Sequence, residues 1–184
     1  MNHPDDVAHV EVRRVHASDG RRIRALRLAA LADPAAGIAF LETAAHAEAQ
    51  PEAFWTDRAV GAALSDEVAQ FIADAGGRWV ATVTVLRPEP GSSNASGRER
   101  TPGRALLVSV FVEEAYRGSG LLDRLVAEAD AWARDRGSVE LALDVHQRNA
   151  RAQAAYRRLG FVATGRTVRS PNGTELEMVR PAAS

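Results

Sequence analysis

Hydrophobic and polar positions alternate over residues 9–15, which is the period-two pattern of a half-buried strand. Residues 18–33 then change to a helical period, with Ile23, Leu26 and Ala30 on one face. Residues 34–50 are less periodic and predict an irregular connection before a helix that starts near Pro51. The inward face of that helix would carry Trp55, Ala59, Ala62 and Ala63. The chain therefore opens with a strand, a helix, a connection and a second helix.

The pattern continues as strands and helices in the C-terminal two thirds of the chain. Two strands flank Gly76 and Gly77, as in a hairpin, and a surface loop rich in Pro, Gly, Ser and Arg follows at 87–104. A strand at 105–112 leads to a helix that ends before Gly137, with an apolar stripe of Leu121, Leu122, Leu125, Val126, Ala129, Trp132 and Ala133. The remaining predicted elements are a strand at 139–145, a helix at 149–160 and a closing hairpin around 171–173.

Composition limits the class of protein. With 184 residues and 46% hydrophobic content, the chain fits a single domain spanning residues 1–184. The absence of cysteine excludes disulfides and thiolate chemistry, and the five histidines show no metal-ligand spacing. No segment approaches the roughly 20 apolar residues that span a bilayer. The net charge of −1, with arginine as the only strong base, gives no reason to expect nucleic acid, so we expect a cytoplasmic protein that binds neither membrane nor nucleic acid.

The stretch YRGSGLL, residues 116–122, joins the strand at 105–112 to the next helix without ordinary turn residues. The first N–H groups of a helix have no partner within the helix and attract anions. Gly118 and Gly120 would leave those groups accessible, while Arg117 adds charge and Ser119 a hydroxyl. The turn is therefore a candidate pyrophosphate site, although it lacks the Lys-Ser/Thr ending of a P-loop and the third glycine of a dinucleotide fingerprint. A plain glycine-rich turn with a solvated arginine is the alternative.

Residues 110–161 resemble the GNAT superfamily of acyl-CoA-dependent N-acyltransferases. The R/Q-x-x-G-x-G/A element of that family falls on Arg117, Gly120 and Leu122. Its second element, N-x-x-A-x-x-x-Y followed by G-F, falls on Asn149, Ala152, Tyr156, Gly160 and Phe161. The resemblance implies an α/β (α+β) single-domain fold with a mixed, mostly antiparallel sheet of about seven strands, about four helices and a splay between strands four and five.

The resemblance also implies acetyl-CoA as cofactor and assigns its contacts. The backbone of the fourth strand would pair with the pantetheine arm, and the turn would hold the pyrophosphate. The implied cofactor-binding residues are Val110, Phe111, Val112, Arg117, Gly118, Ser119, Gly120, Leu121, Leu122, Asn149 and Tyr156. Leu122 departs from the Gly or Ala of the family, so its side chain either crowds the cofactor or packs into the core. Asn149 can serve as a helix N-cap as well as a cofactor contact.

Tyr156 occupies the position of the general acid in this family, where a hydroxyl proton assists the departing CoA thiolate; packing in the core is its alternative role. Candidates for the base that deprotonates the amine are Glu113, Glu114 and Asp144, with His146 a weaker one. The acceptor would approach over residues 33–50 and the closing hairpin, with Phe40, Glu42 and Trp55 as candidate wall residues; a core position is the favoured alternative for Trp55.

The implied function is transfer of an acetyl group to a primary amine of a small molecule, peptide or protein. The alternative is a non-catalytic CoA-binding regulatory module, which Leu122 favours and which Tyr156 and Asn149 oppose. Family members often form homodimers, so a second copy of the chain is a candidate partner.

Overall fold

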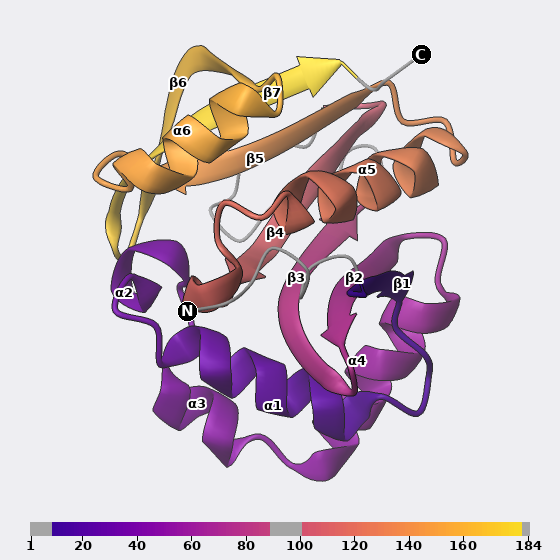
Figure 1. Ribbon diagram of the computed structural model, residues 1–184. Coiled ribbons are helices and arrows are strands. Elements are labelled where there is room, and N and C mark those ends of the chain that lie inside the picture. Colours follow the sequence, from indigo (N-terminus) through magenta and orange to yellow (C-terminus); the bar gives the residue numbers. More distant parts are fainter. Residues whose placement is uncertain (1–8, 89–100, 182–184) are drawn as a thin grey trace.

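The computed structural model describes residues 9–88 and 101–181 (Figure 1). The strands are β1 (Glu11–Arg14), β2 (Val68–Ala75), β3 (Arg78–Leu86), β4 (Arg104–Val112), β5 (Glu140–His146), β6 (Val162–Ser170) and β7 (Gly173–Pro181). The helices are α1 (Gly20–Leu31), α2 (Ala36–Ala39), α3 (Ala44–Ala49), α4 (Glu52–Leu64), the 3₁₀ turn η2 (Glu114–Tyr116), α5 (Leu121–Arg134) and α6 (Ala150–Arg158). None of the helices in the described ranges is both long and apolar enough to cross a bilayer.

All seven strands form one sheet in the order β1-β2-β3-β4-β5-β7-β6. Every neighbouring pair is antiparallel except β4 and β5, which run parallel. The prediction of a mixed, mostly antiparallel sheet of about seven strands is therefore confirmed.

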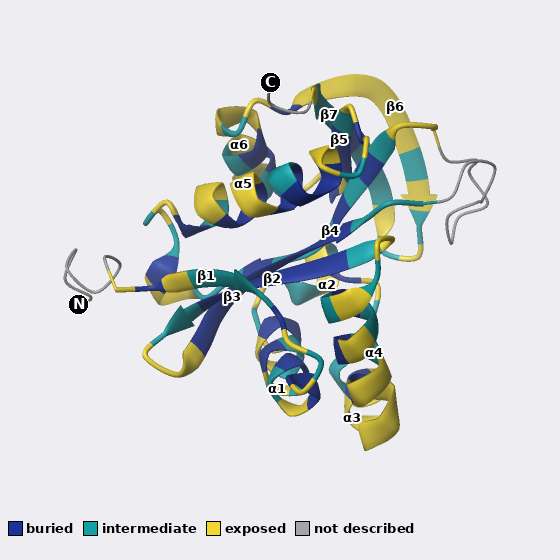
Figure 2. Ribbon diagram, turned by 90° about the vertical axis from the view of Figure 1, so that its right-hand side faces the viewer, coloured by how far each residue is buried: buried dark blue, intermediate teal, exposed yellow. Residues whose placement is uncertain are grey.

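The sheet separates two layers of helices, as Figure 2 shows, with α5 and α6 on one side and α1, α3 and α4 on the other. On the first side, the stripe of α5 packs against β2, β3 and β4, and all its predicted members are buried except the half-buried Leu122. On the second side, Ile23 and Leu26 of α1 pack with Trp55 and Ala59 of α4. The helical stripes predicted from periodicity thus face the core.

The expected irregular connection at 34–50 contains two short helices, α2 and α3, so that prediction was wrong for these segments. The Thr43 side chain caps α3 by accepting the His46 N–H at 3.2 Å. Helices of four and six residues are too short to show a 3.6-residue period, which explains the error. Most of the predicted surface loop at 87–104 lies outside the described residues, and β4 begins at Arg104.

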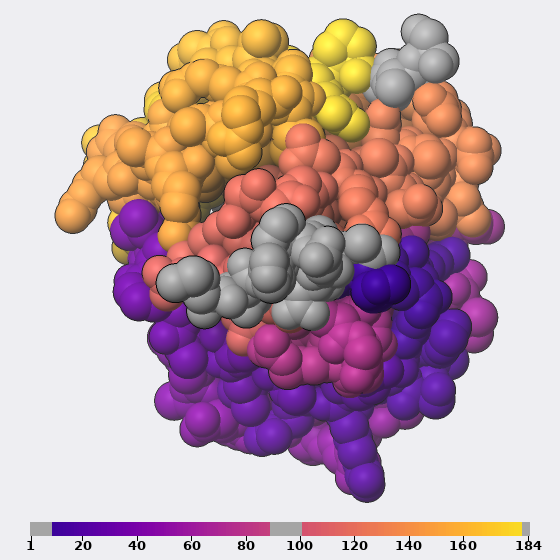
Figure 3. Space-filling model, in the orientation of Figure 1, coloured from indigo at the N-terminus to yellow at the C-terminus, as the bar shows by residue number. Residues whose placement is uncertain are grey.

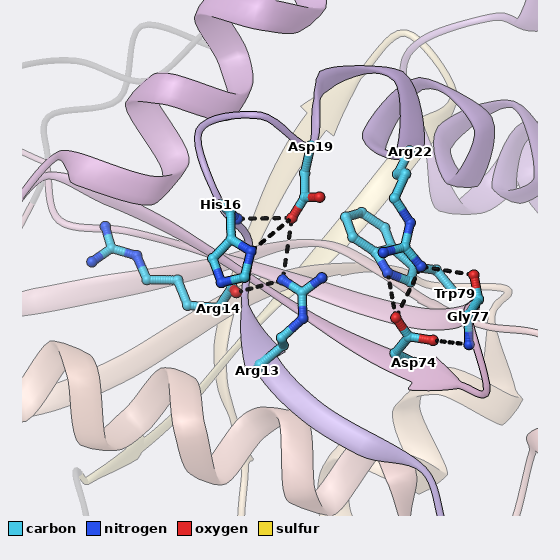
Figure 4. Close-up of polar contacts among 8 residues, drawn as sticks. All are labelled: Arg13, Arg14, His16, Asp19, Arg22, Asp74, Gly77 and Trp79. Carbon is cyan, nitrogen blue, oxygen red and sulfur yellow. Dashed lines mark hydrogen bonds and ion pairs between the residues drawn. The ribbon is translucent and has the colours of Figure 1, made fainter.

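A polar cluster joins α1 to the β2–β3 hairpin (Figure 4). The Asp74 carboxylate accepts hydrogen bonds from Arg22 at 2.9 Å, from the Gly77 N–H at 2.7 Å and from the Trp79 indole N–H at 3.1 Å. The Arg22 guanidinium also lies 4.4 Å from the Trp79 ring centroid. Burial raises the pKa of Asp74, but these donors together outweigh it and hold the pKa below its ordinary value. The cluster fixes the hairpin end of the sheet relative to α1.

Candidate active site

The sheet opens between β4 and β5. These strands pair only over their first three residues, Arg104–Leu106 with Glu140–Ala142. Beyond Leu106 the two strands diverge, which confirms the expected splay. Their separated ends, residues 107–112 of β4 and 144–146 of β5, line a cavity of about 520 Å³.

A β-bulge in β4 accompanies the splay. The register between β3 and β4 shifts between Thr82, which pairs with Phe111, and Thr84, which pairs with Val108. Ser109 lies inside this shift and has a φ of 52°, the only positive φ among the non-glycine residues described. A bulge bends its strand and increases the local twist, so it turns the end of β4 away from β5. Val110, Phe111 and Val112 follow the bulge and lie on the cavity.

The predicted pyrophosphate turn lies at the mouth of this cavity. Gly118 and Gly120 have φ values of 76° and 83°, a region that favours glycine, and both line the cavity. A Cβ added at either position would meet no atom within 4 Å, so the space beside both glycines is open. The N-terminus of the 14-residue helix α5 begins at Leu121, directly after Gly120. The Ser119 hydroxyl is turned inward, where it donates to the Tyr116 carbonyl at 2.5 Å. Backbone amides at a helix N-terminus, in open space, fit a phosphate group.

The Arg117 side chain is already engaged within the protein. Its Nε donates to the Val112 carbonyl at 3.0 Å, and its Nη2 forms an ion pair with Asp33. Asp33 lies between α1 and α2, so Arg117 connects the turn to the N-terminal part of the chain. Leu122 is half-buried, packs against the core on the α5 side and also lines the cavity. Leu122 therefore packs into the core and also borders the proposed cofactor cavity, so the two alternatives do not exclude each other.

Asn149 and Tyr156 enter the cavity from α6. The Asn149 side chain caps the helix by accepting the Ala152 N–H at 3.1 Å, so its capping role is confirmed. Tyr156 is 8% exposed and packs edge-on against Phe161, with ring centroids 5.9 Å apart. Among the described residues, none forms a hydrogen bond with the Tyr156 hydroxyl. Burial raises the pKa of Tyr156 above its ordinary value, so the phenol keeps its proton at neutral pH.

The candidate bases fall in different places. The Glu113 carboxylate pairs with Arg78 at 2.6 Å, and neither Glu113 nor Glu114 lines the cavity. Asp144, by contrast, is an exposed residue on the cavity wall. His146 is buried, and both of its ring nitrogens are in use: Nδ1 accepts the Arg148 N–H at 3.2 Å and Nε2 lies 3.0 Å from the Asn172 carbonyl. This pattern assigns the proton to Nε2 and leaves no ring nitrogen free to act as a base.

The acceptor side agrees in part with the sequence expectation. Phe40 lines the cavity as predicted, but Glu42 pairs with Arg27 at 2.7 Å and Trp55 is 1% exposed in the core, so neither lines it. Asp33 and Glu175 also line the cavity; they lie in the two segments expected on the acceptor side, residues 33–50 and the closing hairpin, but were not named individually. They belong to segments far from both motifs, and no local pattern marks them.

The comparisons with known proteins agree with this architecture. Residues 34–161 match the Acetyltransferase (GNAT) family, and the chain belongs to that family. A segment of 73 residues is 38% identical to an aminoglycoside N(6')-acetyltransferase type 1 from Stenotrophomonas maltophilia, covering 40% of this chain and 47% of the relative. The match thus spans about half the length of the curated relatives.

Two solved structures share the fold along nearly the whole chain. A GNAT-family acetyltransferase from Streptococcus pneumoniae has a TM-score of 0.66 at 21% identity, covering 95% of this chain and 100% of the other. The PaiA N-acetyltransferase from Thermoplasma acidophilum, solved in complex with coenzyme A, has a TM-score of 0.68 at 15% identity, covering 94% and 98%.

Proposed function

We propose that the chain is an N-acetyltransferase that transfers the acetyl group of acetyl-CoA to a primary amine of a small molecule. The observation that carries this proposal is the cavity between the splayed ends of β4 and β5, with an open glycine turn and the α5 N-terminus at its mouth. The β5-facing side of β4 after Leu106 has no strand partner among the described residues, so it can pair with an extended pantetheine arm. Support also comes from the family match and from relatives solved with coenzyme A.

The charges on the cavity wall differ between its two sides. Arg151 and Arg158 line it from α6 and favour an anionic ligand, and Asp123 of the first turn of α5 lines it as well. Asp144 of β5 and Glu175 of β7 line it from the sheet and favour a cation. Register pairs His146 with Glu175 and Asp144 with Glu177, so Asp144 and Glu175 lie on the same face of the two strands. This division suits an anionic cofactor and a protonated amine acceptor.

The residues on the cavity suggest how the chain promotes transfer. Acetyl-CoA would supply an activated thioester and a thiolate leaving group. Asp144 would take a proton from the ammonium of the acceptor, directly or through water, because only a neutral amine is a nucleophile. Tyr156 would hold a proton at its phenolic oxygen for delivery to the leaving sulfur, and its raised pKa keeps that proton in place. Packing of the Tyr156 ring against Phe161 fixes the position of the phenolic oxygen.

The acceptor class is inferred from the acidic wall and from the relatives. The curated relatives act on aminoglycosides, which are small molecules with several amino groups, and two acidic side chains on one wall would favour such a cation over a neutral amine. We therefore propose a cationic small-molecule amine as acceptor. We also place the activity in the cytoplasm, since a cysteine-free chain needs no oxidising compartment to fold. A regulatory module without turnover is less consistent with a protonated Tyr156 on the cavity.

Two measurements test the proposal. CoA should raise the melting temperature, and at 100 times its Kd the stabilisation is about 2.7 kcal/mol, while dephosphorylated pantetheine should stabilise much less. Acetyl-CoA and a panel of aminoglycosides, monoamines and peptides are then assayed with a thiol reagent. Because the chain contains no cysteine, that reagent reports only released CoA. Binding of CoA without release in the presence of any amine would favour the regulatory module, and equal stabilisation by both ligands would refute the phosphate site.

A further inference from the structure

The short helix α2 lies on the cavity between the two diverging halves of the sheet. Ala35, Ile38, Ala39 and Phe40 of this segment line the cavity, so they form an apolar part of its wall. Figure 1 places α2 beside the ends of β6 and β7. In the space-filling view of Figure 3, the violet surface of the N-terminal part meets the orange surface of the C-terminal part on this side of the molecule.

The beginning of α2 is fastened to the β4 half. The Asp33 carboxylate accepts the Ala35 N–H at 2.9 Å through Oδ1, and its Oδ2 pairs with Arg117. Arg117 in turn donates to the Val112 carbonyl at the end of β4. The Asp33 side chain is 12% exposed and that of Arg117 is 23% exposed, so solvent screens this pair less than a surface pair. We call this contact the Asp33 latch.

The end of α2 is fastened to the β5 half. The Asn172 side chain, at the tip of the β6–β7 hairpin, donates to the Phe40 carbonyl at 2.6 Å. The Asn172 carbonyl lies 3.0 Å from His146 Nε2 at the end of β5. Gly173 permits this arrangement, because a Cβ there would lie 2.7 Å from His146 Nε2. We call this contact the Asn172 latch.

We propose that α2 bridges the open end of the splay, and that Asp33 and Asn172 are positioning residues that set the affinity for the acceptor. This inference rests on the proposed function, since it names the element that holds the acceptor of that same site. It also gives the Arg117 side chain a different role from phosphate binding. With its guanidinium held by Asp33 and Val112, Arg117 contributes to the acceptor side, and the turn offers backbone amides to the cofactor.

Kinetic variants separate positioning from chemistry. Asp33→Asn keeps the shape and the Ala35 cap but removes the charge, and Asn172→Ala removes the bond to Phe40. Each should raise the acceptor KM by about 5- to 100-fold, the range for a hydrogen bond to a charged or buried partner, while kcat and the Kd for CoA stay within about threefold. Arg117→Gln should raise the acceptor KM as Asp33→Asn does. The double variant Asp33→Asn/Arg117→Gln should lose no more acceptor affinity than either single variant, because both remove the same ion pair. Asp33→Glu should restore part of the affinity.

Matched controls remove similar groups elsewhere. Ser170→Ala deletes a hydroxyl in the same hairpin whose one hydrogen bond within residues 9–88 and 101–181 is to the Gly173 carbonyl, and Glu52→Gln breaks the exposed pair with Arg21. Both should leave the acceptor KM unchanged. Amide hydrogen exchange at Ala36, Ile38 and Phe40, measured without any substrate, should become faster in the two latch variants and stay unchanged in the controls.

The outcomes distinguish this inference from the function on which it rests. Acceptor affinity is also measured by calorimetry on the CoA-loaded protein, where no turnover occurs. A wild-type chain that binds neither CoA nor any amine refutes both proposals. A wild-type chain that binds both, with latch variants whose amide exchange or acceptor affinity matches the wild type, overturns the bridge alone. Weaker CoA binding in Arg117→Gln, at unchanged acceptor affinity, would show that the Arg117 side chain binds the cofactor phosphate and would overturn its proposed role on the acceptor side.

Discussion

Replacing Tyr156 by Phe removes one hydroxyl and keeps the ring. The ring makes the packing contacts, edge-on against Phe161 at 5.9 Å, and no described residue bonds to the hydroxyl. The free energy of unfolding should therefore change by less than about 1 kcal/mol, the size of a typical net hydrogen bond. The Kd for CoA should also stay close to the wild-type value.

Turnover should respond very differently. A positioned general acid contributes about 10²- to 10⁴-fold, which corresponds to about 2.7 to 5.4 kcal/mol of barrier. Because the proton is needed only as charge develops on sulfur, the loss should appear in kcat. Burial raises the pKa of Tyr156, so in the wild type the acid form persists as pH rises and the rate should show no alkaline decline from this residue below about pH 10.

The assay follows CoA release under conditions in which the chemical step limits the rate. The only other tyrosine, Tyr116, also lines the cavity and provides a matched control. Its hydroxyl lies 3.5 Å from Arg78, and Tyr116→Phe should keep kcat within a few-fold. Wild-type turnover in Tyr156→Phe would refute the acid role and leave Tyr156 as a packing residue.

Three further variants, one of them with a matched control, test other parts of the structure. Leu122→Ala should cost about 1 to 3 kcal/mol of stability in denaturant unfolding, because the side chain packs against the core; tighter CoA binding at unchanged stability would contradict this. Asp144→Asn should lower kcat/KM, whereas Glu113→Gln, off the cavity, should leave it close to the wild-type value. Asp74→Asn should cost about 1 to 3 kcal/mol at neutral pH. Folding lowers the pKa of Asp74, so this stability is present above the ordinary carboxyl pKa and is lost as pH falls through the lowered pKa. The unfolding free energies of the wild type and of Asp74→Asn, measured against pH, should therefore converge in acid. A constant difference between them would count against the reasoning.

The long elements of the fold could be predicted because their burial pattern is repeated. The α5 stripe extends over four turns, and β2 and β3 flank an obvious glycine pair. The bulge at Ser109 could not be predicted, because a serine with positive φ has no sequence signature and depends on the register with β3. The splay that follows from it was expected only through the family resemblance.

In the candidate site, too, some residues could be predicted from the sequence and others could not. Gly118, Gly120, Asn149 and Tyr156 were expected on the motifs and do converge on one cavity. The two latches depend on partners 84 and 132 residues apart in sequence, Asp33 with Arg117 and Phe40 with Asn172. Contacts at such separations arise from the tertiary fold alone, so hydrophobic periodicity carries no information about them.

The cofactor side could be predicted and the acceptor side could not, because the two sides recognise their ligands by different groups. On the proposed cofactor side, backbone amides do the binding, and a backbone conformation with positive φ restricts the sequence to glycine at fixed spacing, which leaves a readable motif. On the proposed acceptor side, side chains from α2, β5 and β7 face one another, and each position tolerates many residue types locally. A motif therefore identifies the cofactor class, while the acceptor must be inferred from the charge and shape of a wall that exists only in the folded chain.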